Sequence, residues 1–312
     1  MKVTNYILIV FGCFALQLHA QQDAQYTQYM YNTMSVNPAY AGSRGQLSMT
    51  SLYRSQWTGI EGSPQTFTLN LHSPIRNSSL GYGVSIVNDN IGNGVVQETY
   101  MDAVLSYTLN LNQDAKLSFG LKAGGNFLSL DFNGLKKYQQ ELVDSDNIDR
   151  RFTPNFGLGV YYHHNRFYTG ISAPNLMESK HFNNSAGSAN DFLSVDRVNF
   201  YWIAGYVMDL SGTMKFKPAI LTKMVSGAPF QLDLSGTFLF QDTFSFGAAY
   251  RLNAAISGLI GFQVSEQVML GLAYDKETTD LGGMRFNDGS LEFLLRWELL
   301  KSYKRVISPR FF

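Results

Sequence analysis

The feature that most constrains the fold of this chain is an alternation of apolar and polar residues that recurs along most of its length. Between residues 47 and 56, Leu47, Met49 and Tyr53 fall in one phase and polar residues in the other, where Leu52 is the apolar exception. Residues 117–124 and 230–240 alternate in the same way. Because a period of two residues is typical of strands with one apolar face, we expect a fold built from strands.

About fourteen candidate strands follow one another. Their expected bounds are Gly45–Trp57, Gln65–His72, Leu80–Asn88, Val96–Leu109, Lys116–Phe127, Asn155–Tyr162, Phe167–Ser172, Asn199–Met208, Lys215–Lys223, Gln231–Phe240, Thr243–Arg251, Ala255–Val264, Val268–Tyr274 and Ser290–Leu299. Connections after even strands are short, such as 241–242, whereas those after odd strands include Ser129–Thr153, Ala173–Val198 and 275–289. An even strand number with short periplasmic turns and longer outside loops is typical of outer-membrane barrels.

Composition favours the same fold. Charged residues make up 15% of the chain, against about 25% in a typical soluble domain, while aromatic residues reach 14%. The mean hydropathy is −0.11, and no apolar run after the N-terminal region approaches the roughly 18 residues of a spanning helix. The sequence therefore predicts an all-β fold, a transmembrane antiparallel outer-membrane β-barrel. A soluble β-sandwich is the alternative, but it has no reason to sort its connections by length.

The first twenty residues are predicted to be a secretory signal peptide. Lys2 precedes an apolar core from about Tyr6 to Leu16, and a small residue, Ala20, stands at the expected cleavage position. Cys13, the only cysteine, lies inside that core; cleavage there as a lipoprotein is the alternative, disfavoured by the bulky Phe11. Without Lys2, 23 of the 24 basic residues remain against 24 acidic ones, a net charge of −1, so no nucleic-acid partner is expected.

Residues 21–44, between the signal peptide and the barrel at 45–300, are expected to lie in the periplasm or in the lumen. Tyr26, Tyr29, Met30 and Met34 recur at helical spacing before Asn37-Pro38 ends the pattern. Because so short a helix is marginal by itself, it needs a surface to pack on. We therefore expect these residues to plug the barrel.

Residues 301–312 are expected to form a basic periplasmic tail that ends in Arg310, Phe311 and Phe312. A terminal phenylalanine is common in outer-membrane barrels as an assembly signal, although Arg310 interrupts the apolar alternation that usually accompanies it. The tail is thus expected either to contact periplasmic machinery or to direct assembly.

Several short sequence motifs resemble those of one known family. They are QYMYN (28–32), NPAYAGSR (37–44), YRSQW (53–57), DNIG (89–92), PNFGLGVYY (154–162), KPAILTKMVSGAPFQLDLSG (217–236) and SPRFF (308–312). Together they resemble the PorP/SprF outer-membrane proteins of the type IX secretion and gliding motility systems of Bacteroidetes. The resemblance implies a non-enzymatic partner of the machinery, needed for secretion or surface attachment of a large cargo protein such as a gliding adhesin. Some members of the family also link the outer membrane to the periplasmic motor complex, so the resemblance implies such a link as a further expectation.

No catalytic, cofactor-binding or metal-binding residue is predicted, because no histidine is well placed beside a nucleophile and a carboxylate. Charged residues instead recur in the polar phase of the strands: Arg54, Lys122, Asp233, Arg251, Asp275, Glu292, Arg296 and Glu298. Since both signs are present, we expect pairing across the lumen or contact with a plug, whereas a wide ion-selective pore would more often show one sign. A passive porin or solute channel is the alternative function, and a barrel enzyme is a third.

Two surface features are also expected. The loops Ser129–Thr153, with helix-forming residues at 135–143, and Ala173–Val198 are predicted to contact the cargo, since loops on a rigid scaffold often carry recognition. An aromatic girdle at the lipid headgroups is predicted to include Trp57, Tyr53, Tyr100, Tyr107, Tyr161, Tyr162, Tyr274 and Trp297. Because Tyr161 lies in the lumen phase of its strand, an inward position is the alternative for this ring. Lipid of the outer membrane is therefore a further expected partner.

Overall fold

The computed structural model describes residues 25–131, 147–177, 179–180, 195–196, 198–226, 228–279, 282 and 287–299. In chain order the elements are α2 (Thr33–Val36), η1 (Pro38–Tyr40), β1 (Leu47–Ser55), β2 (Gln65–Pro74), β3 (Leu80–Ile91), β4 (Val96–Asn110), β5 (Lys116–Leu130), β6 (Ile148–His163), β7 (Phe167–Ala173), β8 (Ser179–Lys180), β9 (Val195–Asp196), β10 (Asn199–Tyr206), β11 (Met208–Asp209), β12 (Met214–Val225), β13 (Gln231–Phe240), β14 (Phe244–Arg251), β15 (Ala255–Gln263), β16 (Val268–Glu277) and β17 (Ser290–Leu299). None of the helices among these elements is long and apolar enough to cross a membrane.

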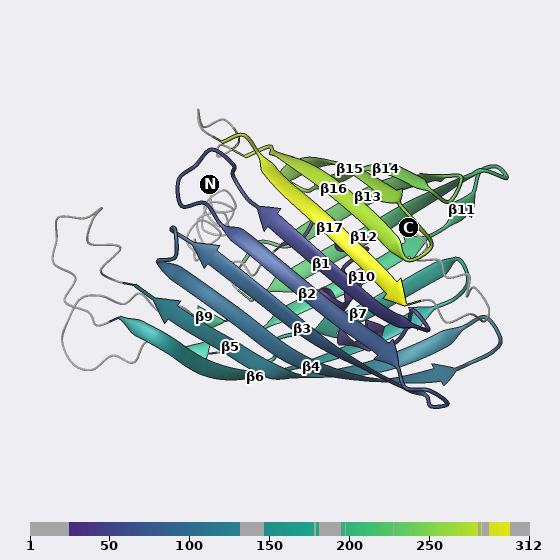
Figure 1. Ribbon diagram of the computed structural model, residues 1–312, viewed down its shortest axis with the longest axis horizontal. Helices are drawn as coiled ribbons and strands as arrows, with labels where there is room; N and C mark the ends of the chain where they lie inside the picture. Colours follow the sequence, from purple (N-terminus) through teal and green to yellow (C-terminus); the bar gives the residue numbers. More distant parts are fainter. Residues whose placement is uncertain are drawn as a thin grey trace, which may run out of the picture.

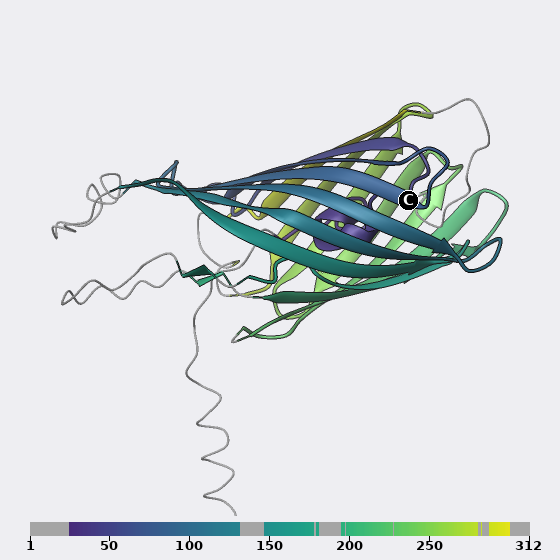
Figure 2. The same ribbon diagram turned by 90° about the horizontal axis from the view of Figure 1, so that it is seen from below.

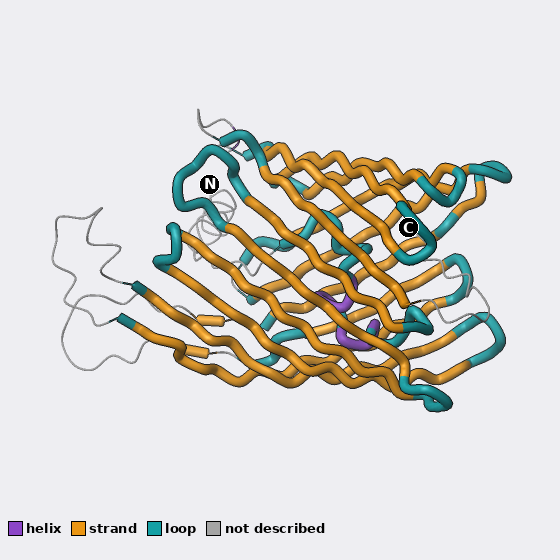
Figure 3. Tube along the Cα trace, viewed as in Figure 1, coloured by secondary structure: helices purple, strands orange, loops and turns teal. Residues whose placement is uncertain are grey.

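All of these strands except β8 and β9, which pair only with each other, form one closed antiparallel barrel (Figures 1 and 3). β1 to β7 are paired in chain order, β7 pairs with β10, and β10 pairs with β12. The strands from β12 to β17 are again paired in chain order, and β17 pairs with β1. β10 and β11 are two parts of one strand, interrupted at Val207, whose N–H donates to the Arg166 carbonyl at 2.8 Å. Counted as one, they reduce the fifteen strands of this sheet to fourteen. The predicted barrel and its strand number are confirmed.

The two faces of the wall have opposite chemistry, as the alternation predicted. Phe119, Leu121 and Ile171 point outward and are 44%, 57% and 60% exposed, whereas Ser118 and Thr68 point inward and are fully buried. An exposed apolar outer face around a polar interior suits a wall that faces lipid.

The two ends of the barrel differ in their connections. At one end, the short-turn end, the strands are joined by residues 75–79, 111–115, 164–166, 210–213, 241–243 and 264–267. At the other, the long-loop end, the connections are 56–64, 92–95, 131–147, 174–198, 226–230, 252–254 and 278–289. The predicted sorting by length is present, although 92–95, 226–230 and 252–254 are short connections at the long-loop end.

The largest error among the predicted strand boundaries is at the start of β6. β6 begins at Ile148, not at Asn155, so the two ends of the expected loop Ser129–Thr153 belong to β5 and β6, where Phe127 and Phe152 pack with ring centroids 5.0 Å apart. Within the described chain, β7 pairs with β6 only over Leu158–His163. Pro154 therefore costs no hydrogen bond to β7, because proline is tolerated on the unpaired edge of a strand.

Candidate functional site: a buried segment inside the barrel

Residues 25–44, here called the lumenal segment, lie inside the barrel (Figures 1 and 2). The phenol of Tyr26 shares a 2.8 Å hydrogen bond with Thr68 of β2, and that of Tyr29 contacts Ser235 of β13. Ser172 of β7 donates to the Val36 carbonyl at 2.6 Å. The segment is thus bonded to strands on several sides of the barrel.

The four residues of the expected plug, Tyr26, Tyr29, Met30 and Met34, are all buried in this segment. They do not form one helical stripe, however, because α2 covers only Thr33–Val36 and turns precede it. Residues outside the predicted stripe are buried as well, namely Thr27, Gln28, Asn32 and Thr33. The wall surrounds the segment and supplies partners in all directions, so a single apolar face is not required.

A carboxylate cluster holds the start of the segment. Glu292 of β17 accepts the backbone N–H groups of Thr27 at 2.6 Å and Gln28 at 3.0 Å, and Asp275 of β16 accepts the Thr27 hydroxyl at 2.6 Å. Arg54 of β1 donates to Asp275 at 2.7 Å and to Glu292 at 2.5 Å. One guanidinium faces two buried carboxylates, and the segment supplies further donors to the excess negative charge. Charge-assisted hydrogen bonds of this kind are the stronger ones in proteins.

A second charged group lies near the short-turn end. Arg44, the last residue of the segment, pairs with Glu298 of β17, and Arg296 lies 3.8 Å from the same carboxylate. Two basic side chains lie near the Tyr31 ring, with Lys217 Nζ 5.5 Å and the Arg296 guanidinium carbon 5.8 Å from its centroid. These distances suit cation–π contacts, so the wall binds this part of the segment through both ionic and aromatic groups.

Inward-facing glycines make room for the segment. A Cβ on Gly120 of β5 would collide with the backbone of Ala39, and one on Gly159 of β6 would collide with the side-chain amide of Asn37. Asn37 Nδ2 donates to the Val160 carbonyl at 3.0 Å, and Asn37 Oδ1 accepts from the Ala39 N–H at 3.0 Å. The sequence analysis did not identify this role. A sequence signal for this role exists, because these glycines fall among the polar, lumen-facing positions of their strands.

Burial determines the protonation of the segment's phenols. It raises the pKa of Tyr26, against the smaller opposing effect of the hydrogen bond with Thr68. Burial likewise raises the pKa of Tyr29, with Ser235 as its opposing partner. Both phenols are therefore neutral donors or acceptors at neutral pH.

The charges predicted for the lumen are paired. Arg251 lies 3.1 Å from Asp233, and Lys122 lies 2.9 Å from Asp102. With the two clusters described above, every one of the eight predicted charged residues has an ion-pair partner. The pairs join side chains of the same or nearby strands, however, so the expected pairing is present but does not cross the lumen. Many ion-selective pores carry rings of side chains with one sign of charge, whereas these eight residues form pairs of opposite charge.

The aromatic prediction is partly wrong. Tyr53, Tyr107 and Tyr274 point outward and are exposed, and the depth of these rings in the membrane stays a prediction. Tyr100 and Tyr161 point inward instead. Tyr100 shares its phase with the buried Asp102, and Tyr161 packs edge-on against Tyr40 of η1 with centroids 5.7 Å apart.

The other predicted contact regions are described only at their edges. Residues 132–146, with the expected helix at 135–143, lie outside the described chain, as do most of 178–197 and the tail residues Arg310, Phe311 and Phe312. β8 and β9 pair with each other at the base of the loop Ala173–Val198.

His72 packs edge-on against Tyr40 and accepts the Gly42 N–H at 3.2 Å. In the described part of the chain, no three His, Cys, Asp or Glu residues are grouped to hold a metal ion.

A family model described as "Type IX secretion system membrane protein PorP/SprF" matches residues 18–297. The chain belongs to the PorP/SprF family. This PorP/SprF protein is therefore a non-catalytic outer-membrane β-barrel of the type IX secretion system. No curated protein matches its sequence.

Solved structures with a similar arrangement include several outer-membrane proteins. The CymD monoaromatic hydrocarbon channel has a TM-score of 0.49 at 11% identity, over 89% of this chain and 94% of its own. Omp33 of Acinetobacter baumannii has a TM-score of 0.45 at 11% identity, over 82% of this chain and 100% of its own. The KdgM porin has a TM-score of 0.37 at 6% identity, over 81% of this chain and 99% of its own.

Proposed function

We propose that this PorP/SprF barrel is a closed scaffold that supports the secretion or surface attachment of a large cargo protein, such as a gliding adhesin. The long-loop end contacts the cargo outside the cell. The short-turn end faces the periplasm, because outer-membrane barrels keep their short turns there, and it contacts the secretion or motor machinery. In this proposal the lumen conducts no solute.

The observation that carries the proposal is the binding of Thr27 to the buried group of Arg54, Asp275 and Glu292. A porin would use its lumenal charges to line a water-filled path, whereas these charges bind each other and the lumenal segment. Segment residues on both sides of α2, such as Gln28 and Ala39, are fully buried. This arrangement favours a scaffold over the alternative, a passive porin or solute channel.

Single-channel recording on the purified full chain in planar bilayers tests the closed lumen. We expect no steady conductance from the unmodified protein and a steady conductance after removal of Gln25–Met34. Heat-modifiable migration on gels would show that the shortened barrel is folded. A large steady conductance of the unmodified protein, or no change after the removal, contradicts the proposal.

The partner contacts need a separate experiment. The full chain and a variant without Ser308–Phe312 are purified from mildly solubilised membranes, and the co-purifying type IX components are identified. We expect the shortened chain to insert and to recover less of the periplasmic components. If the shortened chain does not insert at all, the tail is an assembly signal and not a docking site.

A further inference from the structure

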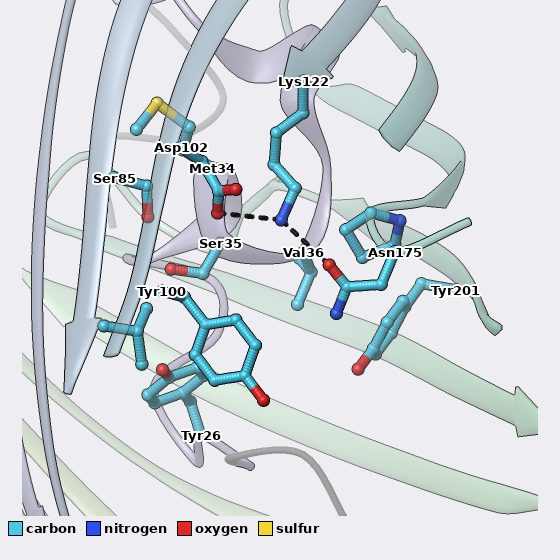
Figure 4. Close-up of a pocket in the computed structure, with 12 residues that line it drawn as sticks. Tyr26, Met34, Ser35, Val36, Ser85, Tyr100, Asp102, Lys122, Asn175 and Tyr201 are labelled. Carbon is cyan, nitrogen blue, oxygen red and sulfur yellow. Dashed lines mark hydrogen bonds and ion pairs between the residues drawn. The ribbon is translucent and has the colours of Figure 1, made fainter. Parts of the chain in front are cut away.

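A cavity of about 70 Å³ lies between the lumenal segment and the wall (Figure 4). Its lining includes Tyr26 from the segment, Tyr100 from β4 and Tyr201 from β10. Tyr100 and Tyr201 belong to the parts of their strands nearest the long-loop end. A single water molecule needs about 10–15 Å³ of such a cavity, so the cavity has room for a group of several heavy atoms.

The charged residues of the cavity neutralise each other. Lys122 Nζ lies 2.9 Å from Asp102 and donates to Asn175 Oδ1 at 3.0 Å, as the dashed lines of Figure 4 show. The side chains of Lys122 and Asp102 are only 10% and 5% exposed. A charged ligand would have to disrupt this buried pair, and that is costly. The cavity therefore favours an uncharged ligand.

The remaining lining is mainly apolar, with a few polar groups. The lining also includes Val36 and Met34 of the segment and Val87 of β3, while Ser85 and Asn175 add polar atoms. Pockets that are mostly apolar with a few placed polar groups typically bind flat, apolar groups and orient them by hydrogen bonds. Aromatic side chains of a partner are the usual occupants of such pockets at protein interfaces.

We propose that this cavity receives one aromatic side chain, of about the size of tyrosine, from an extended part of the secreted cargo. This inference rests on the proposed function and extends it from the loops to the interior. The lumenal segment then closes the barrel and also forms the floor of the cargo site. Pro174 and Asn175, at the base of the connection after β7, line the same cavity.

Binding can be tested with small probes and a matched pair of variants. Saturation-transfer NMR is recorded for N-acetyl-tyrosinamide, N-acetyl-alaninamide and maltose with the full chain in lauryldimethylamine-oxide micelles. Val87→Trp fills the cavity, while Val84→Trp places the same ring on the lipid-facing side of the same strand, where Val84 is exposed. We expect a signal from N-acetyl-tyrosinamide with the unmodified chain and with Val84→Trp, and loss of that signal with Val87→Trp.

A signal that Val87→Trp leaves unchanged overturns the proposal. So does a stronger signal from maltose, which would assign the cavity to a sugar, or equal signals from the tyrosine and alanine probes. Heat-modifiable migration identifies variants that fold. If Val87→Trp does not fold, the smaller Ser85→Val, which removes a polar lining atom, takes its place with an expected weakening of the signal.

Surface retention of the cargo separates this inference from the proposed function. The cargo is the protein whose surface amount falls when the barrel is absent, measured by surface labelling of intact cells. We expect Val87→Trp to reduce retention about tenfold or more, as loss of a central anchor does, and Val84→Trp to leave it unchanged. Full retention with Val87→Trp, beside loss after deletion of the loops, overturns the cavity site alone. Full retention in both cases overturns the proposed function as well.

Discussion

Arg54 on β1 and Asp275 on β16 lie 2.7 Å apart, although β17 separates their strands in the wall. Their side chains are only 3% and 2% exposed. Arg54→Met removes the guanidinium that pairs with both Asp275 and Glu292, and it leaves two carboxylates buried. We expect the free energy of unfolding to fall by about 3–5 kcal/mol, measured by urea titration of the barrel in micelles.

The matched control for this prediction is Arg166→Met. Arg166 pairs with Asp209 at 2.6 Å, but the two side chains are 58% and 44% exposed. Exposed pairs contribute about 0–1 kcal/mol, so this variant should unfold almost as the unmodified chain does. Equal losses in the two variants would contradict the role of the buried cluster.

Gly120→Ala should displace the lumenal segment, because the added Cβ meets the backbone of Ala39. We expect the free energy of unfolding to fall by about 1–3 kcal/mol, as overpacking usually causes. A cysteine introduced as Ser35→Cys, in the half-buried part of the segment, should also react faster with a maleimide. The control is Gly258→Ala, since no atom lies within 4 Å of its added Cβ. Slow labelling in both variants would argue against close contact at Gly120.

The docking of the lumenal segment should weaken at alkaline pH. An exposed phenol loses its proton near pH 10, and burial raises the pKa of Tyr26 and Tyr29 above that value. Below about pH 10 both the docked and the released segment carry neutral phenols, so the full stabilisation is present. As pH rises further, the released segment ionises first and the docked state loses stability.

Conductance recorded between pH 8 and pH 11 measures this effect. The unmodified barrel should begin to conduct above about pH 10. The double variant Tyr26→Phe and Tyr29→Phe lacks both phenols and should show a smaller increase. Superimposable curves for the two proteins would mean that these phenols do not control docking.

The connections at the long-loop end should be needed for the cargo but not for the barrel. Deletion of residues 132–146 or 181–194 removes chain beyond the strand ends and leaves the pairs of β5 with β6 and of β7 with β10. We expect normal membrane insertion and reduced retention of the cargo at the cell surface. Normal retention after both deletions would contradict a role of these loops.

Most of the wall could be predicted because a strand's alternation is a local property. The bounds of β13 and β17 were predicted to the residue, and Leu52 was recognised as an apolar side chain facing the lumen, where it is fully buried. β6 was predicted to begin only after Pro154, and the sequence alone does not show which strands neighbour that position. A proline is acceptable there only because β7 ends before it reaches that position.

The interior could be predicted only in outline. The stripe of Tyr26, Tyr29, Met30 and Met34 indicated that the segment needs a surface to pack on, but it could not identify the partners. Thr27 meets Asp275 at a separation of 248 residues. Such pairs depend on how fourteen strands close into a ring, and that register is a property of the whole barrel. The same holds for Gly159, whose use appears only when Asn37 lies beside it.

The carboxylate cluster also links two steps of assembly. Arg54 and Glu292 are direct partners across the seam between the first and last strands, where β1 pairs with β17. The N–H groups of Thr27 and Gln28, among the first residues of the described chain, bind the same Glu292. The start of the segment therefore has its complete binding site only after the final strand has arrived. Sealing of the ring and arrival of its occupant are then one cooperative event, and a barrel with an open seam would keep its N-terminal end unbound.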